Sequence, residues 1–356
     1  MRVNKKLVLV IVSLALILGG CSLRSKTYEE DNQRTDSNSI VSPQVKVNEE
    51  YYRGVLPYKH SPVNGMLDEI PSRLDANHFE IGLLEIANKV FEPNDFIFQE
   101  GQVLSMDDIE LILGSTEYSG FLYTVNEHNY FSEDNQFAGI VLGMVVSPKY
   151  YLKDENGEYI RDAYGMRKFA FYTDDELIEK SKRVANDLVS IIRRKGVEPR
   201  ILVGVMKAET KDMKLPGTFI LTGDVKQGEN IVWNRLNESF LFLPAKFINL
   251  DGIYSDTARA FNHFKDSIDQ YFPGFAGITG LARFVDDEMV EMTIKVYAEI
   301  DSTVETIQFT QFSVALIEKY FSENIKINLY INSINKPKAI YVKNANGDDF
   351  MHVYRY

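Results

Sequence analysis

Alternation of apolar and polar residues in the last third of the chain is the feature that most restricts the fold. Every second residue is apolar from 292 to 300, and the same period recurs from 325 to 331. A period of two places these apolar side chains on one face of a β-strand. Strands with one packed and one solvated face belong to antiparallel or mixed sheets, whereas strands of doubly wound parallel sheets are apolar almost throughout. An antiparallel or mixed sheet is therefore predicted.

Capping signals predict two long helices. The tetrads Thr173-Asp-Asp-Glu176 and Ser302-Thr-Val-Glu305 each match a capping box. In such a box the hydroxyl accepts a hydrogen bond from the third helical amide, and the glutamate accepts one from the amide of the cap residue. Apolar periodicity predicts further helices at 79–90, 105–113 and 255–271.

A repeated word suggests that the fold is duplicated. The tetrapeptide FAGI occurs at 137–140 and at 275–278, and each copy lies between a predicted helix and a capped helix that is followed by strands. A four-residue word can recur by chance, but the shared order of elements favours duplication. We predict an α+β fold of two related units, each a mostly antiparallel or mixed sheet packed by helices. The first unit, with its N-terminal helices, is placed at 51–240 and the second at 241–356.

The N-terminal segment resembles a bacterial lipoprotein signal peptide. Arg2, Lys5 and Lys6 precede an apolar run at 7–18, which is shorter than the roughly 20 residues that a membrane-spanning helix needs. Its length and flanks suit a signal peptide. The run ends in Leu18-Gly19-Gly20-Cys21, which resembles a lipobox. The alternative is a plain secretory or uncleaved anchor signal in which the cysteine is incidental.

The lipobox resemblance implies a function for Cys21, the one cysteine in the sequence. A lone cysteine forms no intrachain disulfide. The resemblance implies that prolipoprotein-processing enzymes attach a diacylglyceryl group to its sulfur and cleave after Gly20. Two acyl chains then hold the protein stably on a membrane. We expect a signal peptide at 1–20, a lipidated cysteine with a disordered tether at 21–50, and a location on the outer face of the cytoplasmic membrane.

Charge argues against a nucleic-acid partner. Without residues 1–20 the chain has 36 Lys and Arg residues against 51 Asp and Glu residues. Such an acidic chain repels a polyanion as a whole.

Short motifs reveal no catalytic or metal site. The sequence lacks His-Glu-x-x-His, Gly-x-Ser-x-Gly and a Walker loop, and its five histidines are scattered. Asp251 and Asp256 offer two carboxylates to a cation, but a turn before a helix is the better interpretation. Asn156-Gly157 and Asn346-Gly347 predict hairpin turns. We expect no catalytic residue, no metal and no cofactor. A carboxylate pair for glycan hydrolysis stays open, because its separation in space is not visible in a sequence.

Three stretches carry a resemblance to a known family: YYRGVLPYKHSPVNGML at 51–67, the segment 72–105 with its FQEGQ word, and FAGITGLARFVDDEMVEMTIKVYAEID at 275–301. They resemble the CamS sex-pheromone-precursor lipoproteins of Gram-positive bacteria. The resemblance implies that the heptapeptide Leu14–Gly20, LALILGG, is released from the signal peptide as a pheromone. The family's peptide ends in Ala-Ser before the cysteine, whereas this one ends in Gly-Gly.

The resemblance supplies the candidate ligand-binding residues, which lie in its densest motifs: Arg53, Arg73, Asp75, Gln99 and Glu100. The alternative is that the two arginines form structural ion pairs and that 99–101 is a turn. We expect the mature body to be a non-enzymatic binding or interaction module for an unknown envelope ligand or protein. The rival is an envelope enzyme, such as a carboxylate-dependent hydrolase of cell-wall glycan.

Overall fold

The computed structural model describes residues 51–65, 72–210, 215–245, 250–272, 276–333, 336–345 and 347–355. All of them lie within a single body, Ile40–Tyr356, which contains both of the predicted α+β units. The predicted signal peptide, Cys21 and the tether lie outside the described residues, as does Asn346. No helix in the described part of the chain is both long enough and apolar enough to cross a membrane.

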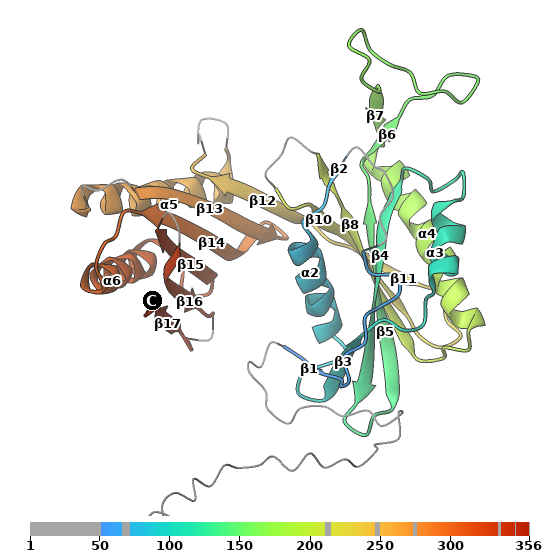
Figure 1. Cartoon of the computed structure of the whole chain (residues 1–356), viewed down its shortest axis with the longest axis horizontal. Helices are drawn as coiled ribbons and strands as arrows, with labels where there is room; N and C mark the ends of the chain where they lie inside the picture. The colour runs from blue at the N-terminus through green and yellow to red at the C-terminus, as the bar shows by residue number, and fades with distance from the viewer. Residues whose placement is uncertain are drawn as a thin grey trace, which may run out of the picture. The chain divides into compact units, whose positions relative to one another are not determined.

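The first of two large sheets has seven strands (Figure 1). In spatial order they are β1 (Arg53–Gly54), β3 (Phe96–Glu100), β4 (Leu122–Ser132), β5 (Phe137–Val146), β8 (Arg200–Lys207), β10 (Thr218–Val225) and β11 (Val232–Arg235). Strands β5 and β8 are parallel, and so are β1 and β3, while the other neighbours are antiparallel. A parallel pair needs a long crossover connection. Helix α4 (Asp174–Arg194) lies in the connection between β5 and β8.

The second sheet has six strands and is also mixed. Its order is β12 (Glu238–Leu243), β13 (Ala276–Val285), β14 (Glu288–Ala298), β15 (Lys326–Ser333), β16 (Lys336–Lys343) and β17 (Phe350–Val353). Only β14 and β15 pair in parallel among these described strands, and helix α6 (Thr303–Tyr320) connects them. Helix α5 (Gly252–Tyr271) connects β12 to β13. The predicted unit boundary between residues 240 and 241 stays a prediction.

The two sheets share one topology, which confirms the prediction of an α+β fold with two related units. Six neighbouring strands of each sheet pair as antiparallel, antiparallel, parallel, antiparallel, antiparallel. Helix α3 (Met106–Leu113) follows β3 as α5 follows β12, and α4 corresponds to α6. The two FAGI words, however, lie on strands that are not equivalent. The first begins β5, whereas the second runs into β13, the counterpart of β4. The alignment by that word is therefore wrong by one strand, although the duplication itself is present.

The predicted capping boxes differ in their geometry. At α4 the Thr173 hydroxyl accepts from the Glu176 amide, and the Glu176 carboxylate accepts from the Thr173 amide, so the box is complete. At α6 the Ser302 hydroxyl accepts from the Glu305 amide. The Glu305 carboxylate instead accepts from the amide of Asp301, one residue before the cap. The second box is therefore half formed.

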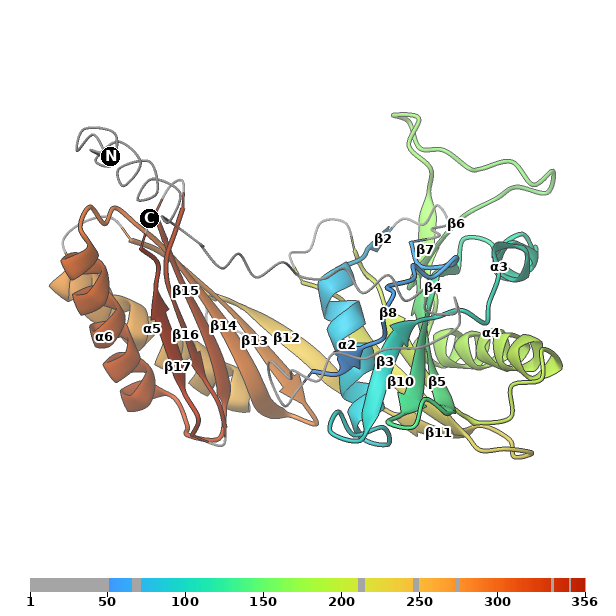
Figure 2. The ribbon, with the colours of Figure 1, turned by 60° about the horizontal axis from the view of Figure 1, so that its bottom comes forward.

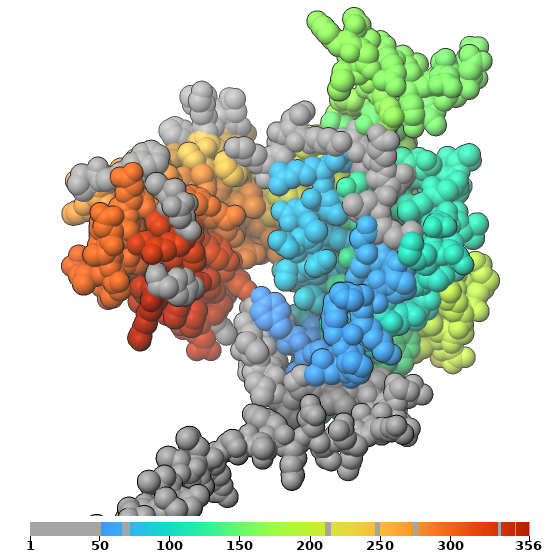
Figure 3. All heavy atoms as spheres, viewed as in Figure 1, coloured from blue at the N-terminus to red at the C-terminus, as the bar shows by residue number. Residues whose placement is uncertain are grey.

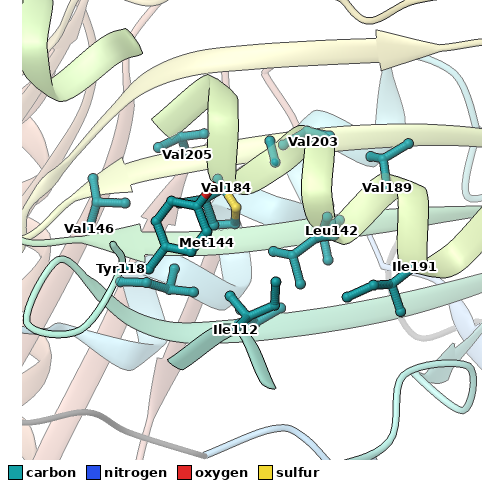
Figure 4. Packing of buried hydrophobic residues seen from close by; sticks show 14 of the residues in the cluster. Ile112, Tyr118, Leu142, Met144, Val146, Val184, Val189, Ile191, Val203 and Val205 are labelled. Carbon is teal, nitrogen blue, oxygen red and sulfur yellow. The ribbon is translucent and has the colours of Figure 1, made fainter. Parts of the chain in front are cut away.

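Helices bury both faces of the first sheet. Helices α3 and α4 cover one face, where apolar side chains of β5 and β8 pack against residues of α4 such as Val184 and Ile191 (Figure 4). Helix α2 (Ala76–Asn88) covers the opposite face through Phe79, Leu83 and Ile86. Burial on both faces explains why β5 is apolar almost throughout.

Glycines bring α2 unusually close to this sheet. A Cβ on Gly82 of α2 would lie 2.1 Å from the ring of Phe219. One on Gly143 of β5 would lie 2.4 Å from Leu83. Glycine inside a helix costs about 1 kcal/mol relative to alanine. The cost is offset here because a larger residue would push the helix away from the sheet.

Helices cover only one face of the second sheet (Figure 2). Apolar side chains of β13, β14 and β15 pack against α5 and α6. Burial alternates along β14 and β15, so the predicted alternation of a packed and a solvated face is confirmed. The remaining face is polar and aromatic, and it forms one wall of the site described next.

Candidate functional site

A groove of about 890 Å³ runs between α2 and the uncovered face of the second sheet (Figure 3). One wall comes from Tyr51, Asp75 and the side of α2 that faces away from the first sheet. The other wall comes mainly from strands β12 to β15. The lining residues are Tyr51, Asp75, Asn77, His78, Ile81, Leu84, Glu85, Asn88, Pro216, Phe240, Leu281, Arg283, Glu291, Thr293, Lys295, Tyr297, Lys326, Asn328, Tyr330 and Asn332.

Strand register arranges the sheet wall in rows. Residues at alternate positions of a strand point to the same face, and neighbouring strands bring their partners side by side. Two rows cross β13, β14 and β15: Arg283–Glu291–Lys326 and Leu281–Thr293–Asn328. A third row pairs Lys295 of β14 with Tyr330 of β15. A fourth row pairs Tyr297 with Asn332. The wall thus changes from charged side chains at one end to tyrosine and amide groups at the other.

Arg283 joins the two walls of the groove. Its Nη1 and Nη2 atoms donate to the two carboxylate oxygens of Glu85 on α2, at 2.8 and 2.7 Å. Its Nε donates to Glu238 on β12 at 2.6 Å. Glu238 is buried, and it also accepts from the amide of Phe219 at 2.6 Å. His78 Nε2 lies 3.3 Å from the same carboxylate. One guanidinium therefore links a helix and two strands.

The pKa shifts in this cluster favour its charged state. Burial alone would raise the pKa of Glu238, but His78, Arg283 and the Phe219 amide lower it below its usual value of 4.5. Burial disfavours the charged guanidinium of Arg283, yet its hydrogen bonds and charge interactions with Glu85 and Glu238 raise its pKa. Both groups are therefore ionised at neutral pH.

Exposed aromatic rings and amide groups form the rest of the lining. Tyr51, Tyr297 and Tyr330 are 48%, 51% and 37% exposed. Burial and the nearby charge of Glu291 raise the pKa of Tyr330, so its hydroxyl stays protonated. Asn88 contributes an amide whose Oδ1 is buried and accepts no hydrogen bond from the described residues. The groove thus offers ring faces together with donors and acceptors.

Asp75 is the candidate ligand-binding residue that lines this groove. It is also the N-cap of α2, because its Oδ1 accepts from the His78 amide at 3.1 Å. Arg73 lies close by in sequence, on the short strand β2 (Ser72–Arg73), which pairs with β9 (Glu209–Thr210). Arg53 forms an ion pair with Glu133 at 2.5 Å, as the structural interpretation expects. A ligand-binding role for these residues stays a prediction.

The FQEGQ word lies in a tightly bonded corner outside the groove lining. Gln99 is buried opposite Asn129, and Glu100 accepts from the Ser61 amide at 2.6 Å and from the Tyr58 hydroxyl. The chain then turns around the buried carboxylate of Glu127. That carboxylate accepts from three successive amides, those of residues 102, 103 and 104.

The glycine of this word is required by close packing. A Cβ on Gly101 would lie 2.3 Å from the Cβ of Glu127. Its amide donates to the backbone carbonyl of Glu127 at 2.7 Å. The turn expected at 99–101 is wrong, because Gln99 and Glu100 belong to strand β3 and the Gly101 amide continues its pairing with β4; the chain bends only after residue 102.

Metal-binding geometry does not emerge from the described residues. No group of three or more His, Cys, Asp or Glu side chains among them is placed to hold a metal ion. Asp251 precedes the first turn of α5, and Asp256 lies 3.3 Å from Arg259 on the same helix. The prediction of a turn over 251–256 before a helix is therefore wrong, because α5 already begins at Gly252 and Asp256 lies within it.

The sequence alone does not identify five residues of this site and its supporting cluster: Arg283, Glu85, Glu238, Tyr297 and Tyr330. Tyr297 and Arg283 lie within the 275–301 stretch that carries the family resemblance, but nothing local marks them. The sequence signal that could have located these positions is the alternation of apolar and polar residues along the strands. Every residue between the apolar positions of β14 and β15 must lie on the opposite face.

Two solved structures share this fold. The sex pheromone precursor of Lactobacillus salivarius subsp. salivarius UCC118 has a TM-score of 0.74 at 21% sequence identity, over 89% of this chain and 100% of that chain. The C-terminal domain of the sex pheromone staph-cAM373 precursor from Staphylococcus aureus has a TM-score of 0.65 at 19% identity, over 82% of this chain and 99% of that chain. These likenesses define the class of fold, an α+β protein built on mixed sheets.

A comparison with protein families identifies the family. The family model described as CamS sex pheromone cAM373 precursor matches residues 58–121 and 114–349. The chain belongs to this family, and the resemblance stated above is confirmed. No curated protein matches the sequence.

Replacing Glu238 by Gln tests the Arg283 cluster. At pH 7 the variant should lose about 2–4 kcal/mol of unfolding free energy, because Arg283 loses one of its two close carboxylates in a buried setting. The pKa of Glu238 is depressed in the folded protein. Its contribution is therefore complete above pH 4.5 and is lost as the pH falls through the folded value.

Urea unfolding of wild type and variant between pH 7 and pH 3 checks this expectation. The difference in unfolding free energy should narrow as the pH falls. Glu179→Gln is the control, because Glu179 forms an exposed ion pair with Lys182 on α4 and should change stability by less than about 1 kcal/mol. A Glu238→Gln deficit that stays constant over the pH range would contradict the assignment.

Proposed function

We propose that the chain is a lipid-anchored, extracytoplasmic binding module without enzymatic activity, and that the groove is its ligand site. The observation that carries the proposal is the uncovered face of the second sheet. Its strand positions present tyrosine rings, amides and balanced charges to an open groove. Ligand sites are usually concave clefts, often at the boundary between two parts of a protein, and this groove lies between α2 and the second sheet.

The lining favours an extended, polar ligand without net charge. Its cations and carboxylates are equal in number: Arg283, Lys295 and Lys326 against Asp75, Glu85 and Glu291. Exposed tyrosine rings pack well on the apolar faces of sugar rings. Asparagine amides both donate to and accept from hydroxyl and acetamido groups. We therefore propose an uncharged glycan strand of the envelope as the ligand.

The rival function, a carboxylate-dependent glycan hydrolase, has less support. A hydrolase needs one carboxyl group that stays protonated near neutral pH beside one that is ionised. At the edge of the groove, Glu238 is instead held ionised by Arg283 and His78. Glu85 forms a bidentate pair with Arg283. The carboxylates near Arg283 thus serve to hold the groove together.

Truncating two groove tyrosines tests the ligand proposal. Wild type should bind an N-acetylglucosamine oligosaccharide in a calorimetric titration. Tyr297→Ala and Tyr330→Ala should each weaken binding about tenfold or more, because a well-buried ring contributes about 1.5–3 kcal/mol. Tyr164→Ala is the matched control, since Tyr164 is exposed and lies outside the groove. Equal affinity of all four proteins, or no binding by wild type, would refute the glycan assignment.

The membrane anchor is proposed from the lipobox resemblance at Leu18–Cys21. Prolipoprotein-processing enzymes and the membrane, through diacylglyceryl-Cys21, are its proposed partners. The outer face of the cytoplasmic membrane is the proposed location.

Cys21→Ser should abolish both lipidation and cleavage, because a hydroxyl replaces the thiolate that takes the lipid. Mass spectrometry of the N-terminus and incorporation of labelled fatty acid measure the two effects. Ser22→Ala, which leaves the cysteine in place, should behave as wild type. The anchor proposal fails if the Cys21→Ser protein still loses residues 1–20 and still fractionates with membranes.

A second function is proposed for the signal peptide, on the basis of the family description as a pheromone precursor. Leu14–Gly20 has five aliphatic residues and no charged side chain. A receptor groove could bury these side chains. Gly19 and Gly20 add little burial and lose more entropy on binding, so a weaker response than for a peptide with larger final residues is expected.

Synthetic LALILGG, applied at micromolar dose to responder cells that carry a pheromone-inducible plasmid, should raise plasmid transfer above baseline. A peptide of the same composition in scrambled order is the control. Baseline transfer with both peptides would rule out the signalling role and would leave the anchored module unaffected.

A further inference from the structure

A forked arm extends from the first unit between β5 and α4 (Figure 1). Strands β6 (Lys149–Tyr151) and β7 (Phe169–Phe171) form its stem. Beyond the stem the chain makes two successive hairpins, closed by the bridges Lys153–Tyr159 and Arg161–Arg167. At the branch point three backbone hydrogen bonds form a ring: Ile160 N to Leu152 O, Lys168 N to Ile160 O, and Leu152 N to Lys168 O. The fork is therefore an ordered structure.

The two hairpin loops have the same backbone geometry. Asp154 Oδ1 accepts from the amides of residues 156 and 158, and Asp162 Oδ1 accepts from those of residues 164 and 166. Gly157 and Gly165 take the left-handed conformation, with φ of +83° and +82°. Such aspartate-closed turns are pre-ordered. The first loop confirms the hairpin predicted at Asn156-Gly157.

The side chains on the two loops differ in kind. The first loop presents Glu155, Asn156 and Glu158. The second loop presents Tyr164 and Met166, which are 91% and 67% exposed. Large apolar side chains held in solvent on an ordered loop indicate a contact surface.

Cations accompany these apolar side chains. From residue 160 to residue 168 there are three Arg and Lys residues against one Asp, whereas the chain from residue 21 on is strongly acidic. Along the arm, Lys149 lies over the rings of Phe169 and Phe171, and Arg167 lies over those of Tyr151 and Tyr159. Cation–π contacts of this kind stiffen the arm.

We propose that the second loop of the fork, residues 160–168, docks on the surface of an anionic phospholipid bilayer. Tyrosine prefers the boundary between headgroups and hydrocarbon, and Met166 extends the apolar contact. The flanking Arg161 and Lys168 are attracted to anionic headgroups. The acidic remainder of the chain is repelled by the same surface, so the fork would meet the bilayer first. The inference does not rest on lipidation of Cys21 or on the groove.

Vesicle cosedimentation tests this proposal with the chain that begins at Ser22, which has neither signal peptide nor lipid. The chain should bind phosphatidylglycerol–phosphatidylcholine vesicles better than vesicles of phosphatidylcholine alone. The double variant Tyr164→Ser, Met166→Ser should lose about tenfold in affinity, and Lys168→Gln should lose less. The matched control is Glu155→Gln, Asn156→Ser on the first loop, which has the same backbone and should not weaken binding.

Circular dichroism shows that each variant is folded before binding is compared. The proposal is overturned if wild type does not bind the anionic vesicles, which is the outcome expected if the fork contacts a protein instead. It is also overturned if the Tyr164, Met166 variant binds as tightly as the control.

Discussion

Arg283 determines how the groove is held. Its guanidinium donates to Glu85 on α2 and to Glu238 on β12, so a helix packed on the first sheet is bonded to two strands of the second. A buried charge is costly unless it is paired and hydrogen-bonded. Here Glu238 also accepts from the amide of Phe219, so the carboxylate is satisfied from both sides. The two walls of the groove are consequently joined by the hydrogen bonds of Arg283 as well as by the covalent backbone.

The duplicated topology explains why the groove exists at all. Each unit places two helices on one face of a mixed sheet. The first unit has α2 in addition, and Gly82 and Gly143 let this helix pack closely on the second face of its sheet. The second unit has no equivalent helix among the described residues. Its free face is therefore available, and the outer side of α2 forms the opposite wall.

Local features of the fold could be predicted from the sequence, and features that depend on pairing could not. The alternation of apolar residues along β14 and β15 predicts directly which face is buried. The capping box of α4 is visible in the sequence because Thr173 and Glu176 lie within four residues of each other. The FAGI word predicted the wrong pair of equivalent strands, because a short apolar string fits any central strand, whichever strand it pairs with. Arg283 escaped notice because its partners are 198 and 45 residues away. No window of sequence contains such a cluster.

The most distinctive word in the chain has a structural explanation. FQEGQ ends strand β3, and Gly101 leaves no room for a side chain against Glu127. The chain then turns around the Glu127 carboxylate, which accepts from three consecutive amides. A corner of this kind tolerates few residues, so it stands out in a sequence. A sheet wall tolerates many, since its polar positions need only face away from the core. In this chain the conspicuous motif reflects tight packing where strand β3 ends, and the proposed binding surface is spread over ordinary-looking positions of strands β12 to β15.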